Sequence, residues 1–275
     1  MEERLVDSLH QRILAMQCQA AIMQEQRHVS AEYATPPDGI PCDRCGNTGY
    51  ISRIEEDGTE TAVACPDCHS KRQVVRRLRQ SGVNPDDYKR YTLASFKADT
   101  PEARQMKDLA MKFLDDLNSN AGFGLFGKSG TGKTHLCIAV CQELTRSHGE
   151  PHFYFSYRSE MPGLIQALRT YKNNVYEDTL KKWKECKNLY IDDLFKLAGT
   201  MEGNKLVKIN KDDLQVMFDI FNARYLNHLR TIISSEYSIN DIIGVDEALG
   251  SRIYDMTKPY GLVIEGTNRR LQKAV

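Results

Sequence analysis

The feature that most constrains this chain is a glycine-rich segment at residues 127–134, Gly-Lys-Ser-Gly-Thr-Gly-Lys-Thr. It matches the phosphate-binding pattern G-x-x-x-x-G-K-[ST] at every fixed position. An apolar run at 123–126 precedes it and a helical pattern over 135–147 follows it, as this motif requires. Its glycines let the backbone turn tightly, so that the N–H groups face phosphate oxygens. The segment therefore predicts a P-loop that binds ATP.

Within the loop, two side chains have separate expected roles. Lys133 should reach the β- and γ-phosphates, and Thr134 should ligate Mg²⁺. The helix that begins here adds the positive end of its dipole. The residues predicted to bind the nucleotide are Gly127, Ser129, Gly130, Thr131, Gly132, Lys133 and Thr134.

A second motif lies at residues 189–193, where the apolar run Leu-Tyr-Ile ends in two acids. Asp192 is predicted to hold Mg²⁺, directly or through water. Asp193 is predicted to orient or deprotonate the attacking water, a task for which the longer Glu is more usual, so we expect slow turnover. A surface acidic turn is the alternative, and the P-loop upstream favours the catalytic interpretation.

Apolar runs and helical patterns alternate along the second part of the chain. Strands are expected at 123–126, 151–157, 189–191, 231–234 and 262–264, and helices at 135–147, 161–171 and 214–229. This alternation predicts an α/β fold with a parallel sheet, right-handed crossovers and flanking helices. We assign residues 85–275 to this ATPase domain and residues 1–84 to a small N-terminal domain.

Four of the eight cysteines form two C-x-x-C pairs, Cys42 with Cys45 and Cys65 with Cys68. The nineteen residues between the pairs fall inside the spacing typical of zinc modules. Four thiolates would close a tetrahedral structural zinc site within about residues 40–70. His69 is a less favoured fourth ligand, and redox chemistry at one pair is the competing interpretation. Cys137 and Cys141 are expected to be buried core residues.

Two segments of the N-terminal region allow two interpretations each. Residues 2–27 carry an apolar helical stripe that either packs on its own domain or binds a partner: Leu5, Leu9, Ile13, Met16 and Ala20. A basic run forms either a solvated helix face or a contact with a phosphate backbone: Lys71, Arg72, Arg76, Arg77 and Arg79.

The overall charge does not indicate a nucleic-acid partner, because 37 basic residues balance 37 acidic ones. Any such contact must come from a local patch. The charged N-terminus has no apolar core typical of a secretory signal, and no stretch approaches the ~18–20 apolar residues that span a bilayer. We therefore expect a protein of the cytoplasm, a compartment in which disulfides are rare, and no contact with a membrane.

Five segments together are similar to one known family. They are the cysteine knuckle at 42–50 with its partner pair at 65–68, the lead-in Tyr-Thr-Leu-Ala-Ser-Phe at 91–96, the P-loop, the acidic strand end, and Gly-Ser-Arg-Ile-Tyr at 250–254. On these residues the chain resembles the bacterial and phage helicase loaders of the DnaC/DnaI type, which are AAA+ ATPases. The resemblance implies ATP-dependent delivery of a hexameric DnaB-type replicative helicase to single-stranded DNA. It also implies that the N-terminal region binds the helicase and that the protein assembles with copies of itself.

The same resemblance implies roles for residues near the C-terminus. Arg252 is similar to the arginine finger that acts on the nucleotide of a neighbouring subunit. Residues 231–236 are similar to the sensor-1 strand, although the family usually has Asn where Glu236 stands, and Ser235 would then substitute. Arg270 corresponds to the arginine of the family's terminal Asn-Tyr-Arg-Leu.

Two other functions remain open at this point. An IstB-type transposition helper ATPase shares the AAA+ core, but it usually lacks a zinc module before the ATPase domain. A non-hydrolysing, ATP-dependent interaction module is the other alternative, because Asp193 and Glu236 depart from the usual catalytic residues. A small-molecule kinase is disfavoured, since the sequence has no arginine-rich lid.

Overall fold

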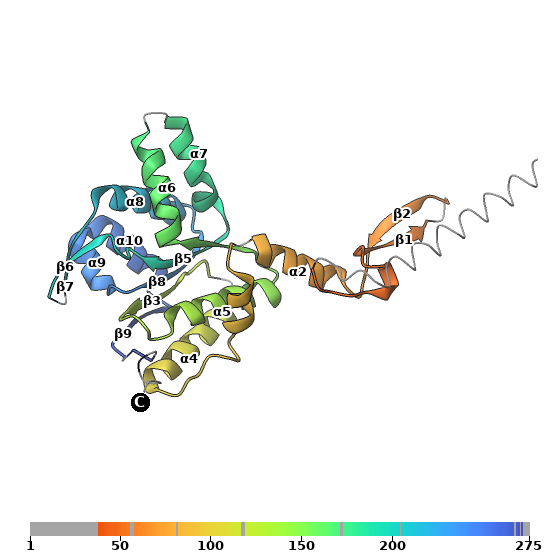
Figure 1. The fold of residues 1–275 in the computed structure, drawn as a ribbon, viewed down its shortest axis with the longest axis horizontal. Helices are drawn as coiled ribbons and strands as arrows, with labels where there is room; N and C mark the ends of the chain where they lie inside the picture. The colour runs from red at the N-terminus through yellow and green to blue at the C-terminus, as the bar shows by residue number, and fades with distance from the viewer. Residues whose placement is uncertain are drawn as a thin grey trace, which may run out of the picture. The chain divides into compact units, whose positions relative to one another are not determined.

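The computed structural model describes residues 38–55, 58–80, 82–116, 119–170, 173–203, 205–266, 268–269 and 271 (Figure 1). The chain divides into two compact units, Met1–Arg76 and Arg77–Val275. The helix expected over residues 2–27 lies outside the described residues, as does Arg270, and the domain limits 1–84 and 85–275 stay a prediction. Within the described ranges, no helix is both long enough and apolar enough to cross a bilayer.

The first unit is built on a small antiparallel hairpin. A short 3-10 helix (Asp43–Cys45) leads into β1 (Tyr50–Ile54), which pairs with β2 (Glu60–Ala64) so that Tyr50 lies opposite Ala64. Helix α2 (His69–Gln80) follows. Because the strands are antiparallel, the residues before β1 and those after β2 meet at one end of the hairpin. Both cysteine pairs lie at that end of the hairpin.

The second unit contains a five-stranded parallel sheet. Its strands are β3 (Phe123–Gly127), β4 (His152–Ser156), β5 (Asn188–Leu194), β8 (Arg230–Ser235) and β9 (Gly261–Ile264), in the order β4-β5-β8-β3-β9. All four neighbouring pairs are parallel. The sheet confirms the five strands and the α/β class predicted from the sequence.

Helices cover both faces of this sheet, after α3 (Pro85–Arg90) at the start of the unit. Figure 1 shows α4 (Pro101–Asp115) and α5 (Lys133–Arg146) on one side, with α8 (Lys211–Leu226), α9 (Ile239–Val245) and α10 (Glu247–Thr257) on the other. The strand order explains this arrangement. The connection from β3 to β4 crosses the sheet in one direction, whereas the connections from β4 to β5, from β5 to β8 and from β8 to β9 cross it in the other. Because each crossover is right-handed, the helices of the first connection lie on one face of the sheet and those of the later connections lie on the other.

Helices α6 (Tyr157–Arg169) and α7 (Asn173–Glu185) connect β4 to β5 and pack against each other. Helix α6 begins four residues before the predicted start at 161, and Tyr157, its first residue, is buried. An antiparallel hairpin of β6 (Gly199–Glu202) and β7 (Lys205–Ile209) follows β5. The sequence patterns did not predict this hairpin.

Candidate functional site

The P-loop lies where β3 ends and α5 begins, and β3 is an interior strand between β8 and β9. Ligands of open α/β sheets bind at this carboxyl edge. The ammonium group of Lys133 donates to the carbonyl oxygens of Gly127 at 2.6 Å and Lys128 at 2.7 Å. Burial of this side chain, which is only 5% exposed, lowers the pKa of Lys133. The loop thus encloses one positive charge at its centre.

Two loop positions admit only glycine. Gly127 has a φ of 117°, and a Cβ atom there would lie 2.2 Å from the carbonyl oxygen of Ile264. Gly130 has a φ of 78°, and a Cβ atom there would lie 1.9 Å from the side-chain oxygen of Asn268. The loop therefore packs directly against the chain that follows β9, which the motif alone does not indicate.

Asp192 lies at the end of β5 and is 8% exposed. Within the described ranges, four hydroxyl groups donate to its carboxylate. Oδ1 accepts from Tyr190 at 2.6 Å, Ser234 at 2.7 Å and Thr134 at 3.0 Å, and Oδ2 accepts from Tyr154 at 2.9 Å. The carboxylate is thereby oriented beside the Thr134 hydroxyl, and the Mg²⁺ that the two would share stays a prediction. An oxygen set of one carboxylate and one hydroxyl suits that ion.

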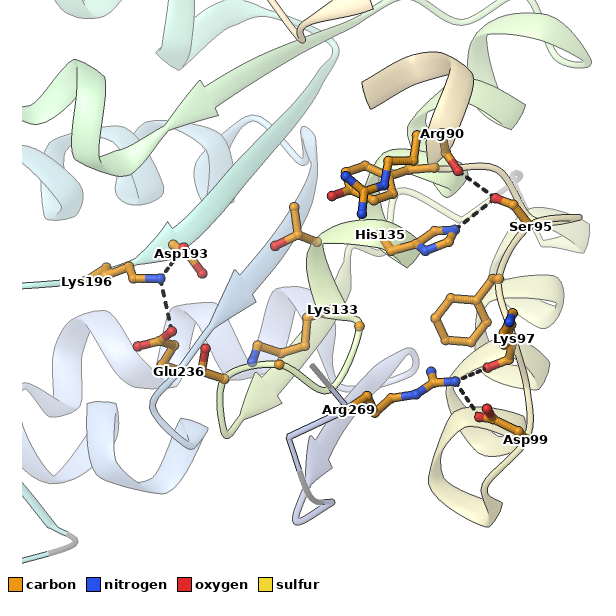
Figure 2. A pocket seen from close by; sticks show the side chains of 16 residues that line it. Arg90, Ser95, Lys97, Asp99, Lys133, His135, Asp193, Lys196, Glu236 and Arg269 are labelled. Atoms are coloured by element: carbon orange, nitrogen blue, oxygen red, sulfur yellow. Dashed lines mark hydrogen bonds and ion pairs between the residues drawn. The ribbon is translucent and has the colours of Figure 1, made fainter. Parts of the chain in front are cut away.

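Asp193 lies beside the β5–β8 irregularity, where the register shifts between Ile191 and Leu194. Its Oδ2 accepts from Lys196 at 2.7 Å, and the same ammonium group donates to Glu236 at 3.0 Å (Figure 2). Burial raises the pKa of Glu236, but hydrogen bonds from Lys196 and Ser129 outweigh it, so the pKa is lowered overall. Both carboxylates are therefore held close to one cation.

These groups line a cavity of about 760 Å³. Figure 2 shows Asp193, Lys196 and Glu236 on one side of Lys133, and Arg90, His135 and Arg269 on the other. Several predicted residues line this cavity: Ser129, Gly130, Gly132, Lys133, Thr134 and Asp193. A cavity of this volume is typical of small-molecule sites. The phosphate motif thus opens into a space suited to a nucleotide.

The far side of the cavity is aromatic and was not assigned from the sequence. His135 packs against Tyr91 and Phe96, with ring centroids 4.9 and 5.2 Å apart. Burial lowers the pKa of His135, which favours a neutral ring. The Tyr91 ring is tilted by 40° to the His135 ring and the Phe96 ring meets it edge-on at 88°, so the three rings form an aromatic wall against which a planar base could pack. The lead-in at 91–96 was the available signal, but it gave no role for its aromatic residues.

Arg269 is a second missed residue of this cavity. Its guanidinium lies 5.6 Å from the centre of the Phe96 ring, donates to the Lys97 carbonyl at 2.6 Å and pairs with Asp99. Its backbone N–H donates to Gly130 in the P-loop at 3.0 Å. Arg270 is the arginine of this segment that the family resemblance indicated, whereas its neighbour Arg269 is the described residue that lines the cavity.

Among the described residues, Gly127, Thr131, Asp192, Ser235 and Arg252 do not line the cavity. Gly127 and Thr131 support the loop, and Asp192 lies behind Thr134. Ser235 is fully buried and donates to the Leu194 carbonyl at 2.9 Å, so it holds the end of β5. Its substitution for a sensor asparagine stays a prediction.

Arg252 lies on α10, away from this cavity. It donates to Asn222 at 3.1 Å and to the Ala248 carbonyl at 2.6 Å. Its guanidinium lies 5.1 Å from the ring centre of Phe218 and 5.9 Å from that of Tyr225. These contacts hold it on the α8–α10 surface.

The four predicted cysteines converge in the first unit, where all their sulfur atoms lie within 4.8 Å of one another. The sulfur atoms of Cys42 and Cys65 are 3.8 Å apart, and those of Cys45 and Cys68 are 3.4 Å apart. Zn–S bonds of ~2.3 Å in a tetrahedron place sulfur atoms roughly 3.8 Å apart. The donor set therefore fits one tetrahedral metal ion.

Neighbouring donors favour the charged form of one of the four thiols, Cys45. Burial raises the pKa of Cys45, but the N–H of Gly49 and other contacts lower it overall to about 6. Arg72 donates to Cys68 at 3.3 Å and also pairs with Asp38. His69 is not part of the sulfur cluster, and its Nδ1 instead lies 3.2 Å from the carbonyl oxygen of Gly49. Arg72, one member of the basic run, thus supports the cysteine module.

Comparison with known proteins shows where this architecture occurs. Residues 103–263 match the family described as the bacterial DnaA ATPase domain. The phage-like element PBSX protein XkdC of Bacillus subtilis strain 168 is 31% identical over 246 residues, covering 84% of this chain and 86% of that protein.

Two solved structures share the fold of the second unit at low sequence identity. The DnaC helicase loader gives a TM-score of 0.53 at 22% identity over 65% of this chain and 98% of that one. Replication initiator DnaA bound to AMPPCP and single-stranded DNA gives 0.52 at 24% identity, over 68% of this chain and 52% of that one. The chain thus belongs to the bacterial DnaA ATPase domain family of AAA+ proteins, with the fold of the DnaC helicase loader.

Proposed function

We propose that this chain binds and slowly hydrolyses ATP in the cytoplasm, and uses that cycle to deliver a hexameric DnaB-type replicative helicase to single-stranded DNA. The observation that carries the ATPase part is the P-loop lysine, Lys133, beside the Thr134–Asp192 pair. The partner assignment is supported by the fold shared with the DnaC helicase loader. Likeness to DnaA, whose structure contains single-stranded DNA, supports the nucleic-acid part.

The P-loop would bind the phosphates through its backbone N–H groups and Lys133. This requires Lys133 to exchange two carbonyl partners for phosphate oxygens, which are stronger acceptors for an ammonium group. Thr134 and Asp192 would hold Mg²⁺, which when bound neutralises charge on the β- and γ-phosphates. The hydroxyl groups around Asp192 would keep its carboxylate oriented for that task.

Asp193 would orient the attacking water and accept its proton. Its carboxylate reaches the cavity, but Oδ2 accepts from Lys196 at 2.7 Å, so this oxygen must give up that bond before it can accept from a water. Slow basal turnover follows from this contact and from the short side chain. A partner that moves the 193–197 turn would then stimulate hydrolysis.

Arg252 would act on the nucleotide of a neighbouring copy. It lies on the α8–α10 surface and, among the described residues, does not line its own cavity. An arginine supplied in trans stabilises charge in the phosphoryl-transfer transition state. Self-assembly on ATP and DNA would therefore complete the site.

The cysteine module would hold one structural Zn²⁺ through Cys42, Cys45, Cys65 and Cys68. Four thiolates leave no open position, so this ion would stabilise the fold of the first unit rather than act on a substrate. In the proposed loader, the N-terminal region containing this module contacts the helicase.

The test combines ATPase and loading assays on the full chain. Phosphate release should rise when helicase and single-stranded DNA are added, and Lys133→Ala should abolish both turnover and loading. A Lys128→Ala variant, which changes an exposed lysine of the same loop, is the matched control and should retain activity. Equal turnover by the Lys133→Ala and unchanged proteins would instead indicate a non-hydrolysing module. Capture of a transposase rather than a helicase would indicate a transposition helper.

A further inference from the structure

Lys196 lines the cavity on the side of Asp193 and Glu236 but belongs to neither nucleotide-binding motif. Lys196 follows β5 in the turn at 193–197, and its ammonium group bridges Asp193 at 2.7 Å and Glu236 at 3.0 Å (Figure 2). Asp193, Lys196 and Glu236 all line the cavity together with Lys133. Lys196 thus adds a second ammonium group, besides that of Lys133, to the part of the cavity next to the P-loop.

The turn that carries Lys196 is an unusual piece of backbone. Asp193, Phe195 and Leu197 have φ values of 56°, 65° and 68°, although none is glycine. Each such residue costs about 1 kcal/mol, so the conformation persists only because its surroundings fix it. The fully buried Phe195 ring and the bond from the Lys196 N–H to the Asp193 carbonyl, 2.9 Å, provide that restraint.

This backbone alternation has a direct consequence for Lys196. Left-handed residues before and after Lys196 turn the chain, so that its side chain contacts both Asp193 and Glu236, the residue directly after β8. Glu236 is also tied to the P-loop, because Ser129 hydrogen-bonds to it and lowers its pKa. The turn, the sensor position and the P-loop are therefore linked through Lys196 and Glu236.

The charges in this cluster would otherwise oppose the proposed ligand. Glu236 stands where the resemblance leads us to expect a neutral asparagine, so the cavity carries two carboxylates on the side of the attacking water. A triphosphate brings further negative charge to the same place, and like charges repel most strongly where water is excluded. Lys133 is the other cation here, and Asp193 and Glu236 both act on its pKa.

We propose that Lys196 is a specificity-determining residue of the nucleotide site, whose ammonium group offsets Asp193 and Glu236 and thereby allows ATP to bind in preference to ADP. This inference rests on the proposed function, because it takes adenine nucleotides as the ligands. The terminal phosphate is the group that differs between the two nucleotides, and Asp193 must lie near it to act on water. Loss of Lys196 therefore lowers the affinity of the site for the triphosphate more than its affinity for the diphosphate.

The test measures equilibrium binding of ADP and of a non-hydrolysable ATP analogue, each with Mg²⁺, to the full chain. In Lys196→Met, affinity for the analogue should fall about tenfold, which corresponds to about 1.4 kcal/mol, while affinity for ADP changes by less than about twofold. Lys196→Arg keeps the charge and should stay near the unchanged protein. Lys258→Met, which removes a lysine paired with Asp255 on the exposed end of α10, is the matched control.

Glu236→Gln provides a second, independent arm. It removes one carboxylate with little change in shape, so in the Lys196→Met background it should restore most of the analogue affinity. Alone, it should raise the preference for the analogue over ADP about threefold, and this arm decides the matter if Lys196→Met does not fold. A purely structural role for Lys196 would weaken both nucleotides equally and would leave the double variant unrescued.

The outcomes separate this inference from the proposed function. The role of Lys196 alone is overturned if the unchanged protein binds the analogue and Lys196→Met alters the preference for the analogue over ADP by less than about threefold. The same holds if Lys196→Met does not fold and Glu236→Gln leaves the preference unchanged. Unchanged protein that binds neither nucleotide overturns both proposals. Selective loss of the analogue in Lys196→Met, with recovery on adding Glu236→Gln, supports the inference.

Discussion

Replacement of Tyr154 by phenylalanine tests how Asp192 is prepared for a metal ion. The Tyr154 hydroxyl donates to Oδ2 of Asp192 at 2.9 Å, whereas Tyr190, Ser234 and Thr134 all donate to Oδ1. Burial raises the pKa of Tyr154, so this hydroxyl remains a donor at any neutral pH. Phenylalanine keeps the ring, whose centroid lies 5.4 Å from that of Tyr190, and removes the hydroxyl alone.

The magnitude follows from the charge and burial of the acceptor. A hydrogen bond to a charged group contributes about 1.5–3 kcal/mol, and Asp192 is almost fully buried. Tyr154→Phe should therefore lower the free energy of unfolding by about 2 kcal/mol when nucleotide is withheld. With Mg²⁺ and a non-hydrolysable ATP analogue, the bound ion would offset the carboxylate charge that the lost hydroxyl leaves unpaired, so the loss should shrink to less than about half of that value.

Denaturant unfolding with and without Mg²⁺-nucleotide measures both quantities. Tyr176→Phe is the matched control, because Tyr176 donates to Asp219 at 2.7 Å, and neither residue is among the described lining residues of the cavity. Its loss of stability should be the same under both conditions. A loss of less than about 0.5 kcal/mol in Tyr154→Phe would contradict the role assigned to this hydroxyl, and so would a loss that does not change when nucleotide is added.

Three further outcomes are expected. Arg252→Ala should bind ATP normally and lose most of its assembly-dependent hydrolysis; normal turnover in mixtures with DNA and helicase would remove Arg252 from the site. Freshly purified, reduced protein should contain about one zinc per chain, and Cys65→Ser should lose it, as read by metal analysis, while Cys137→Ser, a buried cysteine of α5, should retain it. Burial lowers the pKa of His152 from 6.5 in the unfolded chain to about 4 in the folded protein. As the pH falls, the unfolded chain therefore takes up a proton at this histidine before the folded protein does, and the free energy of unfolding decreases between about pH 6.5 and 4. His152→Gln should remove roughly 3 kcal/mol of that pH dependence in unfolding curves, and an unchanged slope would contradict the assignment.

The parts of this protein that sequence patterns predicted share a local physical cause. Strands β3, β5 and β8 contain short apolar runs and are buried along nearly their whole length, so their composition alone identifies them. The P-loop and the acidic end of β5 follow directly from such runs. The cysteine pairs are also local, and the hairpin between them requires only that β1 and β2 be antiparallel.

What the patterns missed depends on residues far apart or on unusual backbone. His135 and Arg269 line the same cavity although they lie far apart in the sequence, and neither belongs to a motif that predicts this arrangement. The turn at 193–197 could not be foreseen, because Phe195 and Leu197 rarely adopt the left-handed conformation they have here. The β6–β7 hairpin escaped because β6 is largely exposed and lacks an alternating apolar pattern.

The contacts of Lys133 with its own loop bear on which molecules can enter. The ammonium group of Lys133 already has two carbonyl acceptors. An incoming anion therefore binds it only if its hydrogen bonds to the ammonium group are stronger than those of the two carbonyl oxygens. Adenosine and its monophosphate bring no β-phosphate to this lysine, so they would leave it with its carbonyls. The loop would in this way reject abundant small nucleosides without any side chain that recognises them directly.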